Sequence, residues 1–272
     1  LDTITVLLSA SDPKVTHELI QSTATQRVGE GVQWLIHNPA DEGSLSYLAA
    51  SKAGDPIYFH RQLAEADLVI PIGVLRPDRA PGYVGICGSL FPFADQKTQD
   101  RFRSGYRKKW RAHQTTWREE VEEATWLLGV QFTVQVVPGP GDSILGVLAG
   151  ELSAVRDQGK AWMKKAWRWE FSESVPLVVA SLEGNPQQQT WSNLAAALSH
   201  AATIVERGGA IAICTRLNES PGEAMQSLAL EDDERPLRGR KKQRVPEDLV
   251  PAVIVREVRR QRRIFLMSDL SS

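Results

Sequence analysis

The sequence predicts an α/β protein made of two α/β domains with mainly parallel sheets and a cleft between the domains. Runs rich in valine, isoleucine and leucine alternate with amphipathic segments, which is the pattern of helices packed on a mainly parallel sheet. The chain has 272 residues, and domains commonly hold about 100–200 residues. We therefore place an N-terminal domain at 1–115 and a C-terminal domain at 116–272. We expect the first domain to be truncated at its start, because Leu1 already reads as part of a strand, and the closing strand could pack back on that domain.

The first domain is expected to hold strands with a helix after the first of them. Pro13 fits the first turn of a helix, since proline already has a helical φ there. The run 66–73 is the strongest strand, because it is apolar on both faces as a central parallel strand should be. The expected elements are strands at 4–8, 32–37, 56–59 and 66–73, and a helix at 13–27.

The second half starts with a helix whose apolar residues recur at spacings of three and four. Trp117, Val121, Ala124 and Leu128 form this stripe, and Gly129 is a suitable helix stop. Gly208-Gly209 should separate a later helix from its strand. Residues 231–248 are charged and predict a solvated loop. The other expected elements are strands at 130–137, 144–148, 176–181, 210–215 and 264–267, and helices from 151, at 191–205 and at 249–258.

Net charge, cysteine content and the length of apolar runs indicate which partners and which cellular compartment to expect. The formal net charge is −1, which favours neither nucleic acid nor an anionic membrane surface as a partner of the whole chain. Cys87 and Cys214 lie far apart and form no metal-ligand or disulfide pattern. No apolar run approaches the roughly 20 residues that a membrane helix needs. We expect a cytoplasmic protein with a small anionic substrate or ligand and no membrane partner.

The Gly-rich segment 73–88 is the first stretch that could bind a ligand. It follows the carboxyl end of the strongest strand, where α/β proteins usually bind ligands, and its backbone N–H groups could face a phosphate or carboxylate. Gly82, Gly85 and Gly88 are its candidate binding positions. The spacing matches neither a Walker loop nor a dinucleotide fingerprint. A structural turn explains the segment equally well.

Two strand ends supply further candidates. His37 follows the strand 32–37 and could act as an acid or base near neutral pH, although a lone histidine is more often a hydrogen-bonded structural residue. Gly184 lies in a strand-to-helix turn that could present N–H groups to an anion. A plain capped turn is an equally good interpretation of that segment.

Basic runs interleaved with aromatic residues are the remaining feature. Arginines next to aromatic rings can grip nucleic acid. However, Glu119, Glu120, Glu122 and Glu123 follow the first run within two turns, which favours a solvated helical face with compensated charge. The runs are 101–111, 238–242 and 259–263.

The order of several motifs resembles the nickel-pincer lactate racemase family over nearly the whole chain. Residues 60–73 (HRQLAEADLVIPIG) resemble the family's Asn-Arg-x-Val-x-x-Ala-Asp-Leu segment, and residues 77–93 resemble its Pro-His-x-x-Ala-Gly segment with the Gly-Gly-x-Lys that follows. Residues 180–186 (ASLEGNP) resemble its Ala-Ser-x-Gly-Gly-Tyr-Pro turn. Residues 119–137 and 206–211 are similar to its Glu-Ala-Ala helix with the next strand and to its Lys-x-Gly-Gly segment.

The resemblance implies a racemase or epimerase that acts on a small 2-hydroxy acid by hydride transfer. Family members carry a nickel-pincer pyridinium nucleotide. A lysine tethers this nucleotide, and a histidine coordinates its nickel ion. Two histidines exchange protons with the substrate hydroxyl. By the same resemblance, His37 and Asp78 occupy the catalytic histidine positions, Gly82, Gly85 and Gly88 lie in the cofactor segment, and Gly184 and Asn193 lie at the substrate.

The chain departs from this pattern at most of the decisive positions. The second histidine is replaced by Asp78, the tethering lysine by Gly88, and the substrate-binding glutamine and lysine by Asn193 and Ala196. No histidine occurs in 94–111, where the nickel ligand is expected, so we assign no metal ligand. The alternative to an isomerase is therefore a non-catalytic homologue that binds a small anion or a protein partner. A nucleic-acid-associated protein that uses the basic runs is a third, weaker interpretation.

Overall fold

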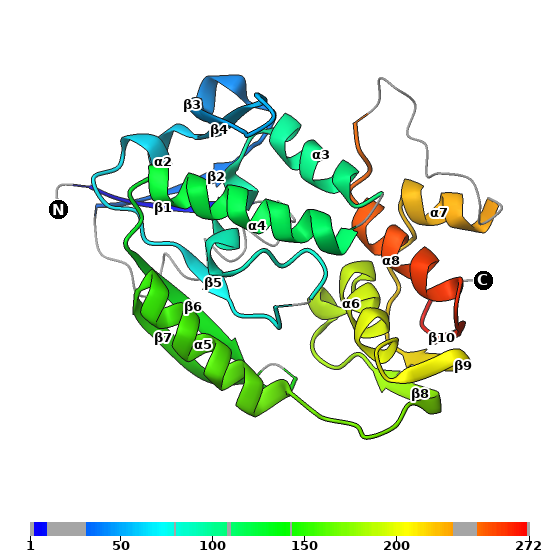
Figure 1. The fold of residues 1–272 in the computed structure, drawn as a ribbon. Helices are drawn as coiled ribbons and strands as arrows, with labels where there is room; N and C mark the ends of the chain where they lie inside the picture. Colours follow the sequence, from blue (N-terminus) through cyan, green and yellow to red (C-terminus); the bar gives the residue numbers. More distant parts are fainter. Residues whose placement is uncertain are drawn as a thin grey trace.

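The computed structural model confirms the α/β class (Figure 1). It describes residues 3–9, 31–78, 80–107, 110–141, 143–230 and 244–270. The expected helix at 13–27, the basic run 238–242 and most of the charged segment 231–248 lie outside the described residues.

The N-terminal part holds two small sheets. The first is parallel and pairs Ile4 with Val32, whereas the second is an antiparallel hairpin that pairs Leu45 with His60. The elements of this part are β1 (Ile4–Ser9), β2 (Val32–His37), η1 (Glu42–Ser44), β3 (Leu45–Ala50), β4 (Pro56–His60) and the short helix α2 (Arg61–Glu65). β2 ends at His37 and β4 ends at His60, and the two rings lie side by side although the strands belong to different sheets.

A three-stranded mixed sheet follows. β5 (Ile72–Val74) is parallel to β6 (Phe132–Pro138), and β6 is antiparallel to β7 (Ile144–Glu151). The helix α5 (Leu152–Trp167) packs on one face of this sheet, and the carboxylate of Glu151 caps its first N–H groups.

The prediction of a central strand over 66–73 was wrong for most of its length. Only Ile72–Val74 is strand, because Pro71 has no N–H for the ladder. The run is also not buried on both sides: Val69 is 7% exposed, whereas Leu68 and Ile70 are about half exposed. The sheet that contains β5 is mixed and not wholly parallel.

Helices connect the first sheets to the rest of the chain. The 3-10 turns η2 (Ile86–Ser89) and η3 (Phe91–Phe93) lead into α3 (Gln96–Gly105), and the long helix α4 (Trp110–Leu127) crosses the centre of the molecule (Figure 1). Trp117 and Val121 lie on its buried face, and Gly129, at φ +67°, follows its end. The domain boundary that we placed after residue 115 falls inside α4.

The C-terminal sheet is wholly parallel, with the order β10-β9-β8. The closing strand pairs with β9, Arg263 lying opposite Ala210. Gly208 and Gly209 lie inside β9, not before it. The elements are β8 (Val175–Ser181), η4 (Pro186–Gln188), α6 (Trp191–Ala201), β9 (Val205–Cys214), α7 (Glu223–Leu230), α8 (Leu249–Arg259) and β10 (Arg263–Met267).

The main hydrophobic core joins both halves of the chain. It runs from Leu75 and Trp117 through Met163 to Ile211 and Val258. The helices α6 and α8 pack against each other and cover one face of the C-terminal sheet. Among the described residues, no helix is long and apolar enough to cross a membrane.

Candidate functional site

His37 lies buried at the carboxyl end of β2, with a residue exposure of 2%. Its Nε2 lies 3.1 Å from the carbonyl oxygen of Ala94. Because a carbonyl can only accept, Nε2 carries the proton and Nδ1 is left with a lone pair. That Nδ1 is buried and has no hydrogen-bond partner among the described residues. Phe93 meets the ring edge-on at a centroid distance of 5.9 Å.

A second histidine, which the sequence analysis did not single out, accompanies His37. The ring of His60 lies edge-on to that of His37, with 5.5 Å between the centroids, and His60 Nδ1 accepts the N–H of Gln62. Burial lowers the pKa of His37, and the neighbouring His60 lowers it further against the opposing effects of the Ala94 carbonyl and Asp95. Burial also lowers the pKa of His60. The pair therefore favours neutral imidazoles.

Asp78 lies in different surroundings. Its carboxylate is about half exposed and forms ion pairs with Arg118, at 3.7 Å, and with Lys160, at 3.9 Å. Arg118 also donates a hydrogen bond to the backbone oxygen of Asp78. No residue among these contacts is shared with the contacts of His37. The structure thus gives the two predicted catalytic positions separate sets of partners.

The Gly-rich segment is held by side chains from α3 and α4. The N–H of Gly82 donates to the hydroxyl of Tyr106, and Gln114 donates to the carbonyl oxygens of Ala80 and Tyr83. Gly82 and Gly85 have φ values of +78° and +90°, which glycine adopts without steric cost. The N–H of Gly88 donates to the Gly85 carbonyl. In this turn the N–H groups of Gly82 and Gly88 are bonded within the protein.

The structure brings Gly184 and Asn193 together at the start of α6. Gly184 has φ +102°, and an added Cβ would collide with the side chain of Gln188. The side-chain amide of Asn193 donates to the Gln188 carbonyl at 2.7 Å, while the hydroxyl of Thr190 caps the N–H of Asn193. Both predicted substrate positions therefore contribute to one capped strand-to-helix turn.

Gln189, in the same turn, is a buried polar residue that the sequence analysis missed. Its Oε1 accepts from the Thr215 hydroxyl at 2.7 Å and from the N–H of Arg216 at 3.0 Å. Its Nε2 lies 3.3 Å from the carbonyl oxygens of Leu182 and Glu183. One amide thus links the carboxyl ends of β8 and β9. Only its position after a strand could have signalled it.

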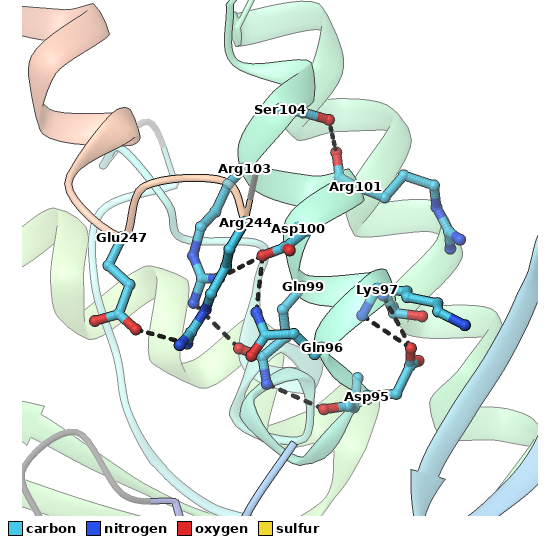
Figure 2. A network of polar contacts seen from close by, with 12 residues as sticks. Asp95, Gln96, Lys97, Gln99, Asp100, Arg101, Arg103, Ser104, Arg244 and Glu247 are labelled. Carbon is cyan, nitrogen blue, oxygen red and sulfur yellow. Dashed lines mark hydrogen bonds and ion pairs between the residues drawn. The ribbon is translucent and has the colours of Figure 1, made fainter. Parts of the chain in front are cut away.

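A polar network surrounds the start of α3 (Figure 2). The Asp95 carboxylate caps the helix by accepting the N–H groups of Lys97 and Thr98. Asp100 accepts from Gln96 and Arg103. Gln99 and His37 both contact the carbonyl oxygen of Ala94, so this network adjoins the histidine pair and fixes the helix beside it.

Two pockets lie away from all of these residues. They have volumes of about 210 and 480 Å³ and lie between the first turn of α4 and α8, the smaller one also reaching α6. Neither is lined by His37, Asp78 or any of the predicted glycine or asparagine positions. The positions suggested by the family and the pockets are therefore different parts of the molecule.

Comparison with known proteins gives a likeness in fold. No protein-family model and no curated protein sequence matches the chain. The structure of the lactate racemase apoprotein from Thermoanaerobacterium thermosaccharolyticum is similar, with a TM-score of 0.79 and 16% identity over 98% of this chain and 67% of that one. A crystal structure of a Thermotoga maritima protein is similar with a TM-score of 0.64 and 12% identity, over 100% of this chain and 77% of that one. The chain has a lactate racemase-like fold.

The tether position does not fit the nickel-pincer group of the family that the sequence resembles. Gly88 stands where the family's motif has its tethering lysine, and even an added Cβ there would lie 2.9 Å from Cγ2 of Val84. We therefore derive no reaction step through this cofactor.

Proposed function

We propose that the chain is a lactate racemase-like protein that has lost the family's pincer chemistry. In this proposal it is a non-catalytic homologue of these isomerases and binds a small anion. The likeness in fold, with a TM-score of 0.79 to a lactate racemase apoprotein, supports the relation to 2-hydroxy-acid racemases. The identity of 16% leaves room for the loss of the activity itself.

The separate surroundings of His37 and Asp78 carry this proposal. Racemisation by the family's route needs two groups that face one substrate carbon from opposite sides and exchange protons with its hydroxyl. His37 is 2% exposed and is held by the Ala94 carbonyl. Asp78 is held at the surface by Arg118 and Lys160. The ion-pair partners of Asp78 are thus not among the described residues that contact His37.

The competing proposal is an active 2-hydroxy-acid racemase or epimerase. Its support is the histidine retained at the end of β2, in the position that the resemblance assigns to the first acid–base group. This proposal needs His37 to become accessible to substrate and needs another residue to replace the second histidine.

The decisive experiment measures racemisation with the protein made in its most favourable form. The chain is expressed together with enzymes that make the pincer cofactor. The purified protein is then incubated with D-lactate in a buffer that contains nickel. Chiral chromatography then follows L-lactate. We expect no more L-lactate than from the His37→Gln variant. L-lactate formation by the unmodified chain that the His37→Gln variant lacks would overturn the proposal.

A further inference from the structure

Two basic runs that lie far apart in the sequence meet in the folded chain. The run 101–111 spans α3 and the start of α4, and the run 259–263 begins at the end of α8. The indole N–H of Trp110 donates to the carboxylate of Glu257 on α8, and α3 also contacts α8. The two pockets described above lie along this contact, so the charges of both runs converge on them.

Half of the described arginines of the first run are neutralised nearby. Arg101 forms ion pairs with Glu120 and Asp55, and Arg103 pairs with Asp100 and donates to Gln99. For these two residues the interpretation as a compensated surface is supported.

Arg107 and Arg111 are different. Neither takes part in an ion pair among the described residues. The Nε–H of Arg107 is buried and has no hydrogen-bond partner among them. The guanidinium of Arg111 lies 4.5 Å from the ring centroid of Trp110, which fixes its plane by a cation–π contact. A buried N–H without an acceptor is costly, and Arg107 as a whole lines the larger pocket.

The larger pocket, of about 480 Å³, is lined by four arginines. They are Arg107 and Arg111 from the first run, with Arg256 and Arg260 on the α8 side. Glu257 is the acidic residue of the lining, and its carboxylate already accepts the Trp110 N–H. Since the whole chain has a formal net charge of −1, this concentration of positive charge is local. A concave site in which one sign of charge predominates attracts ions of the other sign.

We propose that this pocket binds the phosphate groups of a small phosphorylated molecule. The planar, forked guanidinium matches phosphate oxygens in pairs, and the volume is within the usual range of small-molecule sites. The inference rests on the binding role proposed above but not on the loss of catalysis. A nucleic acid fits less well, because Trp110 is 4% exposed and Arg111 covers its ring, so its face offers no surface for stacking a base.

The probe is inorganic pyrophosphate, titrated into the full chain by isothermal titration calorimetry. The double variant Arg107→Gln/Arg256→Gln removes two charges from the pocket. The matched control Arg61→Gln/Arg168→Gln removes two charges that pair with Glu65 and Glu170 elsewhere on the surface. We expect the pocket variant to bind pyrophosphate at least about tenfold more weakly, since charge-assisted hydrogen bonds are lost, and the control to bind it as the unmodified chain does. Arg107→Lys, which keeps the charge but loses the Nε–H, should show a smaller loss.

Several results would overturn the proposal. They are no binding of pyrophosphate by the unmodified chain, equal losses in both double variants, or tight binding of a single-stranded oligonucleotide that pyrophosphate does not displace. If circular dichroism shows that the double variant is unfolded, Arg256→Gln alone is titrated, and unchanged affinity overturns the proposal. Racemase activity would overturn the proposed loss of catalysis and leave this site untouched, so the two failures are distinguishable.

Discussion

Tyr106 and Gln114 hold the Gly-rich segment between them. The Tyr106 hydroxyl accepts the N–H of Gly82 and donates to Oε1 of Gln114. Both donor–acceptor distances are 3.1 Å. The amide of Gln114 then donates to the carbonyl oxygens of Ala80 and Tyr83. Tyr106 and Gln114 are buried, so the loop is fixed from the side of the helices by groups that have no access to water.

Gln114→Ala should therefore lower the free energy of unfolding. The substitution leaves the Tyr106 hydroxyl and two carbonyl groups with fewer partners, and an unsatisfied buried polar group costs about 1–3 kcal/mol. Urea unfolding followed by circular dichroism measures this change. Thr115→Ala, on the exposed side of the same helix, is the control and should change the stability much less. Equal effects of the two substitutions would contradict the structural role of Gln114.

Gly85→Ala tests the turn itself. Gly85 has φ +90° and ψ −175°, a region that is essentially confined to glycine and that costs a residue with a Cβ about 1–3 kcal/mol. Gly43, in the exposed turn η1, is not in that region and serves as the control. We expect Gly85→Ala to lower the melting temperature clearly and Gly43→Ala to change it little. Similar melting temperatures for both variants would remove the special status of Gly85.

Local patterns predicted most of the elements of the fold because each has its own apolar period. The strands at 32–37, 144–148 and 264–267 and the helix at 249–258 were found within a few residues. The prediction for the run 66–73 was wrong because an apolar stretch of that length is typical of a buried strand, although Pro71 interrupts the ladder. The basic run that contains half of α3 was predicted as a helical face, but no bounds were given for the helix, and Asp95 as an N-cap was the signal that could have revealed its start.

The candidate sites were less predictable, since their meaning depends on contacts between distant segments. His37 was identified, but no pattern in the sequence pairs it with His60 or with the Ala94 carbonyl. The convergence of Arg107 with Arg256 depends on how α4 meets α8, which no local spacing encodes. The assignments of Gly88 and Asn193 came from a family resemblance, and at 16% identity a likeness in structure supports the fold and not the role of individual residues.

The histidine pair predicts a loss of stability in acid. Burial lowers the pKa values of His37 and His60 below the ordinary 6.5. In the unfolded chain these groups bind protons at a higher pH than in the folded one, so stability falls as the pH drops through about 6.5 and is fully present above it. Urea unfolding between about pH 5 and 8 measures the slope. His37→Gln should reduce this slope; a slope equal to that of the unmodified chain would show that His37 does not contribute.

The last prediction concerns covalent attachment of the pincer cofactor. After expression with the cofactor-making enzymes, the chain should show its unmodified mass, because Gly88 offers no amine at the tether position. Gly88→Lys alone should also stay unmodified, since its Cβ would lie 2.9 Å from Cγ2 of Val84 and either Val84 or the backbone would have to shift. Gly88→Lys/Val84→Ala relieves that contact and is the fair test of the position. Intact-mass spectrometry measures whether each of the three proteins carries an adduct, and peptide mapping locates it. An adduct on the double variant alone would mean that the chain lacks only its tether, whereas an adduct on any lysine of the unmodified chain would show that the tether is misplaced and that the loss of pincer chemistry is wrong.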